Sequence, residues 1–203
     1  DGSAVTGVVR TDLVTAAPRK TLNLSSGHYT ALTHTSYPTV PTDNRTALPA
    51  VARGPVAAPL PPLNAAAILR AHGLRADKSL GQNFLQDPYA LEKITAASEI
   101  LPTDTVLEVG PGLGALTRHL AAAAKQVIAV ELDGRLLPPL GEVLTGYTNI
   151  KIVHGDMLKL APAEIVPATD YLVVANIPYY ITSALLRHLL ETTPRPRRVL
   201  LTV

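Results

Sequence analysis

The sequence of 203 residues contains no cysteine, which excludes disulfide bonds and metal sites built from thiolates. Its six histidines are scattered, and none is paired with a carboxylate at the spacing of metal ligands, so we expect no metal site. The sequence also lacks an apolar run of roughly 20 residues, the length of a membrane-spanning helix. Together these absences predict a soluble protein of a reducing compartment, with no membrane partner.

A large excess of charge of either sign is also missing, because the formal net charge is only +2. This surplus permits an anionic partner but is too small to indicate a nucleic acid by itself. Hydrophobic residues make up 47% of the chain, which is enough to bury the core of one domain with an appendage.

Two regions of the sequence differ in composition. Residues 1–62 are rich in Ala, Pro, Thr and Ser without a sustained period, and they predict a disordered low-complexity extension. Their few acids and their Arg, Ser and Thr content are also typical of a targeting peptide, which remains an alternative. We expect the ordered domain to cover residues 63–203.

The ordered region begins with two predicted helices and continues as an alternation of strands and helices. The first helix lies within residues 63–74 and is closed by Gly73; the second follows the loop 78–86, with Asp87 as its cap and Pro88 as its first residue. Apolar strands are predicted at residues 105–110, 126–132, 150–156, 171–176 and 197–203. Helices are predicted between them at residues 113–124, at 134–147 with an interruption near Pro138 and Pro139, around Ala163, and at 182–192.

This alternation predicts an α/β fold, a Rossmann-like, doubly wound and mostly parallel sheet covered by helices on both faces. The last predicted strand ends at Val203 with no following strand to pair with it. We therefore expect the sheet to be incomplete at its C-terminal end and the chain to be a fragment.

A glycine-rich stretch, EVGPGLGA at residues 108–115, lies between a strand and a helix. Gly110, Gly112 and Ala115 match the G-x-G-x-x-G/A pattern of dinucleotide sites, and Glu131 follows at the next strand's end. The pattern fits a nicotinamide cofactor, another adenosine-bearing cofactor, or a tight turn without a ligand. Glu131 alone is compatible with a helix cap, but together with the glycines it is placed to bind two ribose hydroxyls.

A second acid, Asp156, ends the third predicted strand. Its carboxylate is able to accept a hydrogen bond from an adenine amino group, and it is equally suited to cap a helix. His154, two residues earlier, is more typical of a packed or solvated strand end than of a catalyst.

The stretch YLVVANIPYYIT at residues 171–182 places an Asn, a Pro and two Tyr at the end of a strand, the edge where open α/β sheets bind ligands. Methyl transfer to the exocyclic amine of adenine requires two acceptors for its N–H groups and a ring to stack on the base. Asn176 offers a side-chain carbonyl, Ile177 or Pro178 a backbone carbonyl, and Tyr179 a ring. The alignment of donor and acceptor matters more here than a strong base.

The motifs GQNFL (81–85), EVGPGLGALT (108–117), VIAVELD (127–133), GD (155–156) and NIPYYIT (176–182) resemble the ribosomal RNA adenine N6-dimethyltransferase family. Pro111 and the segment LGALT (113–117) are more similar to the bacterial small-subunit type than to the branch that methylates large-subunit rRNA and confers macrolide resistance. The small-subunit type dimethylates two adjacent adenosines in the 3′-terminal hairpin of 16S rRNA. It implies a cytoplasmic monomer that acts on a small-subunit precursor particle.

The resemblance also implies a cofactor and a set of site residues. The methyl donor would be S-adenosylmethionine, with Asn83 and Leu85 lining its site, Gly110 near its methionine end, Glu131 at its ribose and Asp156 at its adenine. Asn176 would lie between cofactor and target amine, with Pro178 and Tyr179 completing the catalytic turn. The family's further strands and its small helical RNA-binding domain have no counterpart in this sequence.

Two other functions compete with the methyltransferase. A nicotinamide-dependent oxidoreductase would use the same glycines, but the sequence shows no evident proton donor for it and leaves the turn at Asn176 unexplained. A non-catalytic RNA-binding assembly factor could share the fold. The basic residues Arg70, Arg75 and Lys78, and a second cluster of Arg195, Arg197 and Arg198, are candidates for contacts with RNA phosphates or ordinary solvated charges.

Overall fold

The computed structural model describes residues 6–10 and 60–202, with one six-stranded sheet at its centre. The strands run in the order β1-β6-β5-β2-β3-β4. Their bounds are β1 Thr6–Arg10, β2 Thr105–Val109, β3 Gln126–Glu131, β4 Ile150–His154, β5 Leu172–Asn176 and β6 Arg198–Thr202. Every pairing among β2 to β6 is parallel, and β1 alone runs antiparallel, against β6. The predicted doubly wound, mostly parallel α/β fold is confirmed.

The strand order reverses between β2 and β5. The chain proceeds from β2 outward to β3 and β4, then returns to the other side of β2 to form β5 and β6. β2 and β5 pair directly, with Val109 opposite Ala175. Since ligands of open α/β sheets bind beyond the carboxyl ends of the strands at such a reversal, the topology marks the place of the site.

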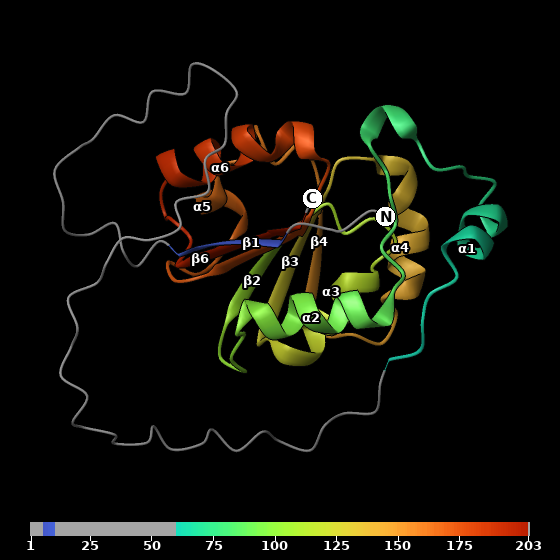
Figure 1. The fold of residues 1–203 in the computed structure, drawn as a ribbon, viewed down its shortest axis with the longest axis horizontal. Coiled ribbons are helices and arrows are strands. Elements are labelled where there is room, and N and C mark those ends of the chain that lie inside the picture. Colours follow the sequence, from blue (N-terminus) through green and yellow to red (C-terminus); the bar gives the residue numbers. More distant parts are fainter. Residues whose placement is uncertain (1–5, 11–59, 203) are drawn as a thin grey trace, which may run out of the picture. The chain divides into compact units, whose positions relative to one another are not determined.

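Helices cover both faces of the sheet (Figure 1). Leu91 and Ile94 of α2, with Leu120 of α3, pack on one face, whereas Leu185 and Leu189 of α6 pack on the other. The bounds are α1 Ala65–Ala71, α2 Pro88–Ser98, α3 Ala115–Ala123, α4 Leu137–Val143, α5 Pro162–Ile165 and α6 Thr182–Glu191, with short 3₁₀ turns η1 Lys78–Leu80, η2 Gly134–Leu136 and η3 Tyr179–Ile181. Apolar residues on both faces of the central strands account for the near-continuous hydrophobic runs in the sequence.

The predicted helix ends of the first two helices are confirmed. Asp87 accepts a hydrogen bond from the N–H of Tyr89 and Pro88 opens α2, while Gly73 closes α1 with a left-handed φ of +64°. The helix predicted at residues 134–147 is divided next to the two prolines, as expected, into the 3₁₀ turn η2 and the helix α4. Both prolines lie in the first turn of α4, where no intrahelical N–H partner is lost, so the α-helix itself continues unbroken after them, to Val143.

One stretch of the predicted disordered extension is a strand. Thr6–Arg10 pairs with β6 along its whole length, so the expectation of disorder is wrong for these residues, and so is that of an unpaired edge at β6. The cause is non-local, because an open sheet edge offers unpaired N–H and C=O groups that a short segment of almost any sequence can bind. The remainder of the predicted extension, residues 1–5 and 11–59, lies outside the described residues.

Among the described residues, no helix is both long and apolar enough to cross a membrane. In that same part of the chain, no group of three or more His, Asp or Glu side chains is arranged to hold a metal ion.

Candidate active site

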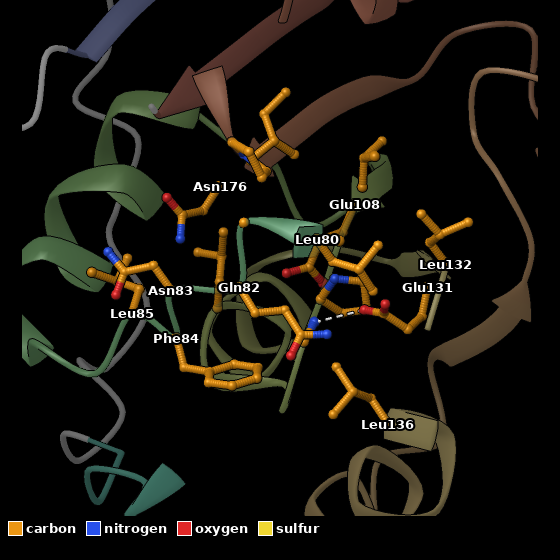
Figure 2. Close-up of a pocket in the computed structure, with 18 of the residues that line it drawn as sticks. Leu80, Gln82, Asn83, Phe84, Leu85, Glu108, Glu131, Leu132, Leu136 and Asn176 are labelled. Carbon is orange, nitrogen blue, oxygen red and sulfur yellow. Dashed lines mark hydrogen bonds between the residues drawn. The ribbon is translucent and has the colours of Figure 1, made fainter. Parts of the chain in front are cut away.

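A cavity of about 420 Å³ opens at the carboxyl edge of the sheet, where the strand order reverses. Figure 2 shows Glu108, Glu131 and Asn176 around it, each from a different strand. The structure brings all of the sequence-predicted site residues into its lining, namely Asn83, Leu85, Gly110, Glu131, Asp156, Asn176, Pro178 and Tyr179. Its volume falls within the range of roughly 300–1,000 Å³ that is common for small-molecule sites.

The glycine-rich turn after β2 forms one wall of the cavity. Gly110 and Gly112 have positive φ angles of +71° and +57°, a conformation that residues with a Cβ rarely adopt. A Cβ on Gly112 would lie only 3.0 Å from the ring of Phe84, which belongs to the loop across the cavity. The glycines thus allow both the sharp turn into α3 and the close contact with this loop.

Glu131 binds the glycine-rich turn to the end of β3. Its Oε2 accepts a hydrogen bond from the N–H of Gly112 at 3.0 Å (Figure 2), and its Oε1 accepts one from Asp133 at 2.8 Å. Burial raises the pKa of the Glu131 carboxyl above its ordinary value, although the backbone donors oppose this. Each oxygen still has a lone pair that can accept a hydroxyl proton.

The position of Asp156 is compatible with both roles that the sequence suggested, a ligand-binding acid and a helix cap. It lines the cavity, as a ligand-binding acid should, but its Oδ1 also accepts a hydrogen bond from the N–H of Leu158 at 3.0 Å, as a cap would. Its Oδ2 lies 3.4 Å from the ammonium of the exposed Lys159. His154 is exposed at the end of β4, where its ring lies close to the backbone of Gly134.

The loop that carries Asn83 and Leu85 contacts two neighbouring parts of the site, the end of β3 and the turn after β5. Gln82 donates from Nε2 to Asp133 Oδ2 at 2.8 Å and accepts the N–H of Asp77 at 2.8 Å. Gly81 has a φ of +63°, and a Cβ on it would lie 2.5 Å from Cγ of Pro178 and 3.3 Å from the Tyr180 ring. The loop is therefore in direct contact with the turn that follows β5.

That turn presents Asn176 and two tyrosines at the mouth of the cavity. Ile177 donates its N–H to the carbonyl of Thr202, and the Asn176 side chain accepts a hydrogen bond from the Thr202 hydroxyl at 2.9 Å. The side chains of Tyr179 and Tyr180 are both 65% exposed. An exposed ring beside a polar amide is suited to bind a planar base.

Glu108 lines the same cavity and was missed by the sequence analysis as a functional residue. It is 1% exposed, and burial, with a smaller contribution from the charge of Glu131, raises its pKa to about 8 against the opposing effect of the nearby Thr117 hydroxyl. Among the described residues, neither Glu108 Oε2 nor the buried Oγ1 of Thr117 has a partner in hydrogen-bond geometry, so the hydroxyl acts on the carboxyl by proximity and not through a formed hydrogen bond. A detectable signal was present, because Glu108 is the only charged residue in the otherwise apolar stretch TVLEVG.

The charge of the cavity limits the ligands that it can bind. Its described lining contains the carboxyl groups of Glu108, Glu131 and Asp156 but no Lys, Arg or His. A pyrophosphate would be placed near acids with no basic side chain to bind it, whereas a ligand with a positive charge would be attracted.

Comparison with known proteins identifies the family. Residues 73–203, more than half of the chain, match the family described as ribosomal RNA adenine dimethylase. The chain belongs to this family. It is 50% identical over 137 residues to ribosomal RNA small subunit methyltransferase A of Dehalococcoides mccartyi strain CBDB1, an alignment that covers 67% of this chain and 47% of the relative. This confirms the resemblance found from the motifs.

Two further ribosomal RNA methyltransferases are similar to this member of the adenine dimethylase family. The protein of the same name from Ligilactobacillus salivarius strain UCC118 is 46% identical over 136 residues, which cover 64% of this chain and 46% of that one. The crystal structure of 23S rRNA methyltransferase ErmE superposes with a TM-score of 0.51 and 42% identity, over 56% of this chain and 45% of the other. The chain thus spans about half the length of the relatives that it matches.

The two basic clusters of this chain lie in different places. Arg197 pairs with Asp104 at 2.9 Å and Asp170 at 2.8 Å, and Arg198 pairs with Glu99 and donates to the Ser98 carbonyl. Since β6 begins at Arg198, this cluster lies at the amino edge of the sheet, away from the cavity. Lys78, by contrast, lies in η1, which leads directly into the loop that lines the cavity.

Proposed function

We propose that this chain transfers methyl groups from S-adenosylmethionine to the N6 amine of adenines in ribosomal RNA. The observation that carries the proposal is that the turn Asn176–Tyr179 opens into the same cavity as the glycine-rich turn and the three carboxyl groups. The substrate that fits best is the pair of adjacent adenosines in the 3′-terminal hairpin of 16S rRNA, in a small-subunit precursor particle. The 50% identity to a small subunit methyltransferase favours this substrate over 23S rRNA, the alternative that the similarity to ErmE keeps open.

The cavity fits S-adenosylmethionine better than a nicotinamide dinucleotide. The former carries a sulfonium and an ammonium, which the carboxylates of Glu131 and Asp156 in the lining attract, whereas the pyrophosphate of the latter would meet no basic side chain among the described lining residues. When bound, S-adenosylmethionine supplies a methyl group activated by the positive sulfur.

Each residue of the site then has a defined role in binding. Asn83 and Leu85 line the cofactor site, and Gly110 approaches the methionine end of the cofactor. Glu131 binds the ribose of the cofactor, and Asp156 binds its adenine. The contact of Asp156 with the N–H of Leu158 uses only part of the capacity of its carboxylate, so binding of an adenine amino group is compatible with the cap.

The turn after β5 positions the target amine. Asn176 offers Oδ1 to one N–H of the amine, and the backbone carbonyl of Ile177 or Pro178 takes the other; the Pro178 carbonyl would share this role with the N–H of Ile181, which it accepts at 3.3 Å. Two acceptors draw the amine toward tetrahedral geometry and direct its lone pair at the methyl group. Tyr179 stacks on the adenine after it has left its own stack.

We further propose that residues 63–203 form the catalytic domain of a monomeric cytoplasmic protein, and that a further helical domain outside this sequence contributes to RNA binding. In this scheme, residues 1–62 are an extension outside the catalytic domain, of which Thr6–Arg10 contributes a strand to the sheet edge.

The proposal is tested by incubating the chain with S-adenosylmethionine and small-subunit particles that lack the modification, then measuring N6,N6-dimethyladenosine by mass spectrometry of digested rRNA. Dimethylated adenosine at two adjacent positions is the expected result. A parallel titration with S-adenosylmethionine and NAD separates the alternatives. Binding of NAD alone would overturn the proposal in favour of an oxidoreductase, and binding of S-adenosylmethionine without transfer would favour a non-catalytic assembly factor.

A further inference from the structure

Thr202, the last residue of β6, makes a side-chain contact with the turn after β5. It is 4% exposed, and its hydroxyl lies 2.9 Å from Oδ1 of Asn176. Its backbone carbonyl also accepts the N–H of Ile177 at 3.1 Å. The same residue thus binds two consecutive positions of the turn, one through its backbone and one through its side chain.

The hydroxyl has a single proton and two possible acceptors. The carbonyl of Ala175 is 3.4 Å away, whereas Oδ1 of Asn176 is 2.9 Å away. The shorter distance is near the optimum for a hydrogen bond and the longer one is at its limit, so the proton belongs to the Asn176 contact. The backbone contact is available to any residue at position 202, but this contact requires a hydroxyl.

The contact determines how the Asn176 amide is oriented. An amide that rotates by half a turn exchanges its oxygen and nitrogen, and it would then present N–H donors to a target amine that is itself a donor. A hydroxyl that donates to Oδ1 opposes this rotation. Because a carbonyl oxygen accepts two hydrogen bonds, Oδ1 retains one lone pair for the target amine.

We propose that Thr202 is a positioning residue that holds Asn176 in the orientation needed to accept the N–H of the target adenine. This proposal rests on the proposed function of the turn. Thr202 would act through Asn176 and touch neither cofactor nor RNA, so its removal should lower the rate of transfer and leave cofactor binding unchanged.

The test compares Thr202→Val, which keeps the shape and removes the hydroxyl, with Thr202→Ser, which keeps the hydroxyl. We expect kcat for methyl transfer to fall about tenfold in the valine variant, the range of one lost hydrogen bond, with the Kd of S-adenosylmethionine unchanged. The serine variant should retain most of the activity. Thr105→Val, at a buried threonine that begins β2 at the opposite edge, is the matched control and should leave kcat unchanged.

A second measurement does not depend on activity. In ¹⁵N-resolved NMR spectra, the side-chain NH₂ resonances of Asn176 should shift in Thr202→Val and stay close to their original positions in Thr202→Ser. If the valine variant does not fold, Thr202→Ala is compared with Thr202→Ser instead. Both variants lack the Cγ2 methyl group of threonine, and only the serine variant has a hydroxyl.

The outcomes are distinct. Unaltered kcat in Thr202→Val, or equal losses in the valine and serine variants, would overturn the positioning role while the methyltransferase function stands. If the unmodified chain transfers no methyl group, the proposed function fails, and the Asn176 resonances still decide whether Thr202 orients the amide.

Discussion

The two edges of the sheet use charge in opposite ways. At the amino edge, Arg197 is held between Asp104 and Asp170, and Arg198 pairs with Glu99. At the carboxyl edge, the described cavity lining has three carboxyl groups and no basic side chain, and the neighbouring contacts are made by backbone amides, Gln82 and Thr202. Paired charges stabilise the fold at the amino edge, whereas at the carboxyl edge Glu131 has no basic partner among the described residues and Asp156 has only the exposed Lys159, so both carboxylates are available to a ligand.

The edges also differ in what a substitution should affect. Strands that run from one edge to the other contribute to the hydrophobic clusters on both faces of the sheet, so a change at either edge can alter stability. Only the carboxyl edge carries the cavity, so only changes there should separate methyl transfer from folding. The following predictions test this separation, beginning with the largest effect.

Asn176→Ala should reduce kcat for methyl transfer by on the order of 100- to 1,000-fold, because it removes an acceptor that acts only on the aligned amine. The Kd of S-adenosylmethionine, measured by calorimetry, should change little. The matched control is Asn149→Ala before β4, which removes hydrogen bonds to the carbonyls of Ala121 and Ala124 and should lower stability without changing kcat. Equal activity of Asn176→Ala and the unmodified chain would refute the mechanism.

Gly81→Ala should lower methyl transfer on the order of 100-fold, because the added Cβ would meet Pro178 at 2.5 Å and displace the catalytic turn. Gly73→Ala is a close control, since its φ of +64° matches the +63° of Gly81 but nothing lies within 4 Å of its Cβ. Both variants should lose stability from backbone strain in thermal unfolding, and Gly81→Ala should lose more, because the clash with Pro178 adds to the strain. If their activities are equal, the contact with Pro178 does not position the turn.

Glu108→Gln should change how stability depends on pH. The folded protein holds the Glu108 proton up to a pKa of about 8, above the ordinary value of 4.5, so the folded state binds more protons than the unfolded state between these values. Stability from this group is therefore complete at low pH and is lost as pH rises toward 8, at up to about 1.4 kcal/mol per pH unit. The glutamine variant should lose less stability than the unmodified chain between pH 5 and pH 8, as measured by denaturant unfolding. Parallel pH profiles of the two proteins would contradict the burial of a protonated acid.

Arg197→Ala should have the smallest effect, a loss of about 1 kcal/mol of stability, because the arginine is partly exposed and its ion pairs are only partly shielded from water. Neither kcat nor RNA affinity should change, since Arg197 lies at the edge away from the cavity. A filter-binding measurement with rRNA at two salt concentrations checks this. A weaker affinity with a reduced salt dependence would instead place RNA phosphates at the amino edge.

Local sequence patterns were sufficient for most of the fold. The caps at Asp87 and Gly73 and the apolar strands from Thr105 onward depend on interactions within a few residues or on burial of both sheet faces, and both leave periodic signals in the sequence. The change from the 3₁₀ turn η2 to α4 beside Pro138 was also predicted, because a proline favours the first turn of a helix. The strand at Thr6–Arg10 was missed because its partner is almost the whole chain away.

The residue types of the site and the family were determined by the sequence itself, because glycines, carboxylates and the NIPYY turn stand at strand ends in a fixed order. Only the tertiary structure decided which residues hold the site in position. Gly81 and Gln82 belong to the GQNFL motif without a role of their own there, Thr202 lies outside the motifs, and each makes its contact with a residue far away in the chain. Such contacts depend on how the parallel strands align at one edge, and this alignment is set by packing of the whole sheet.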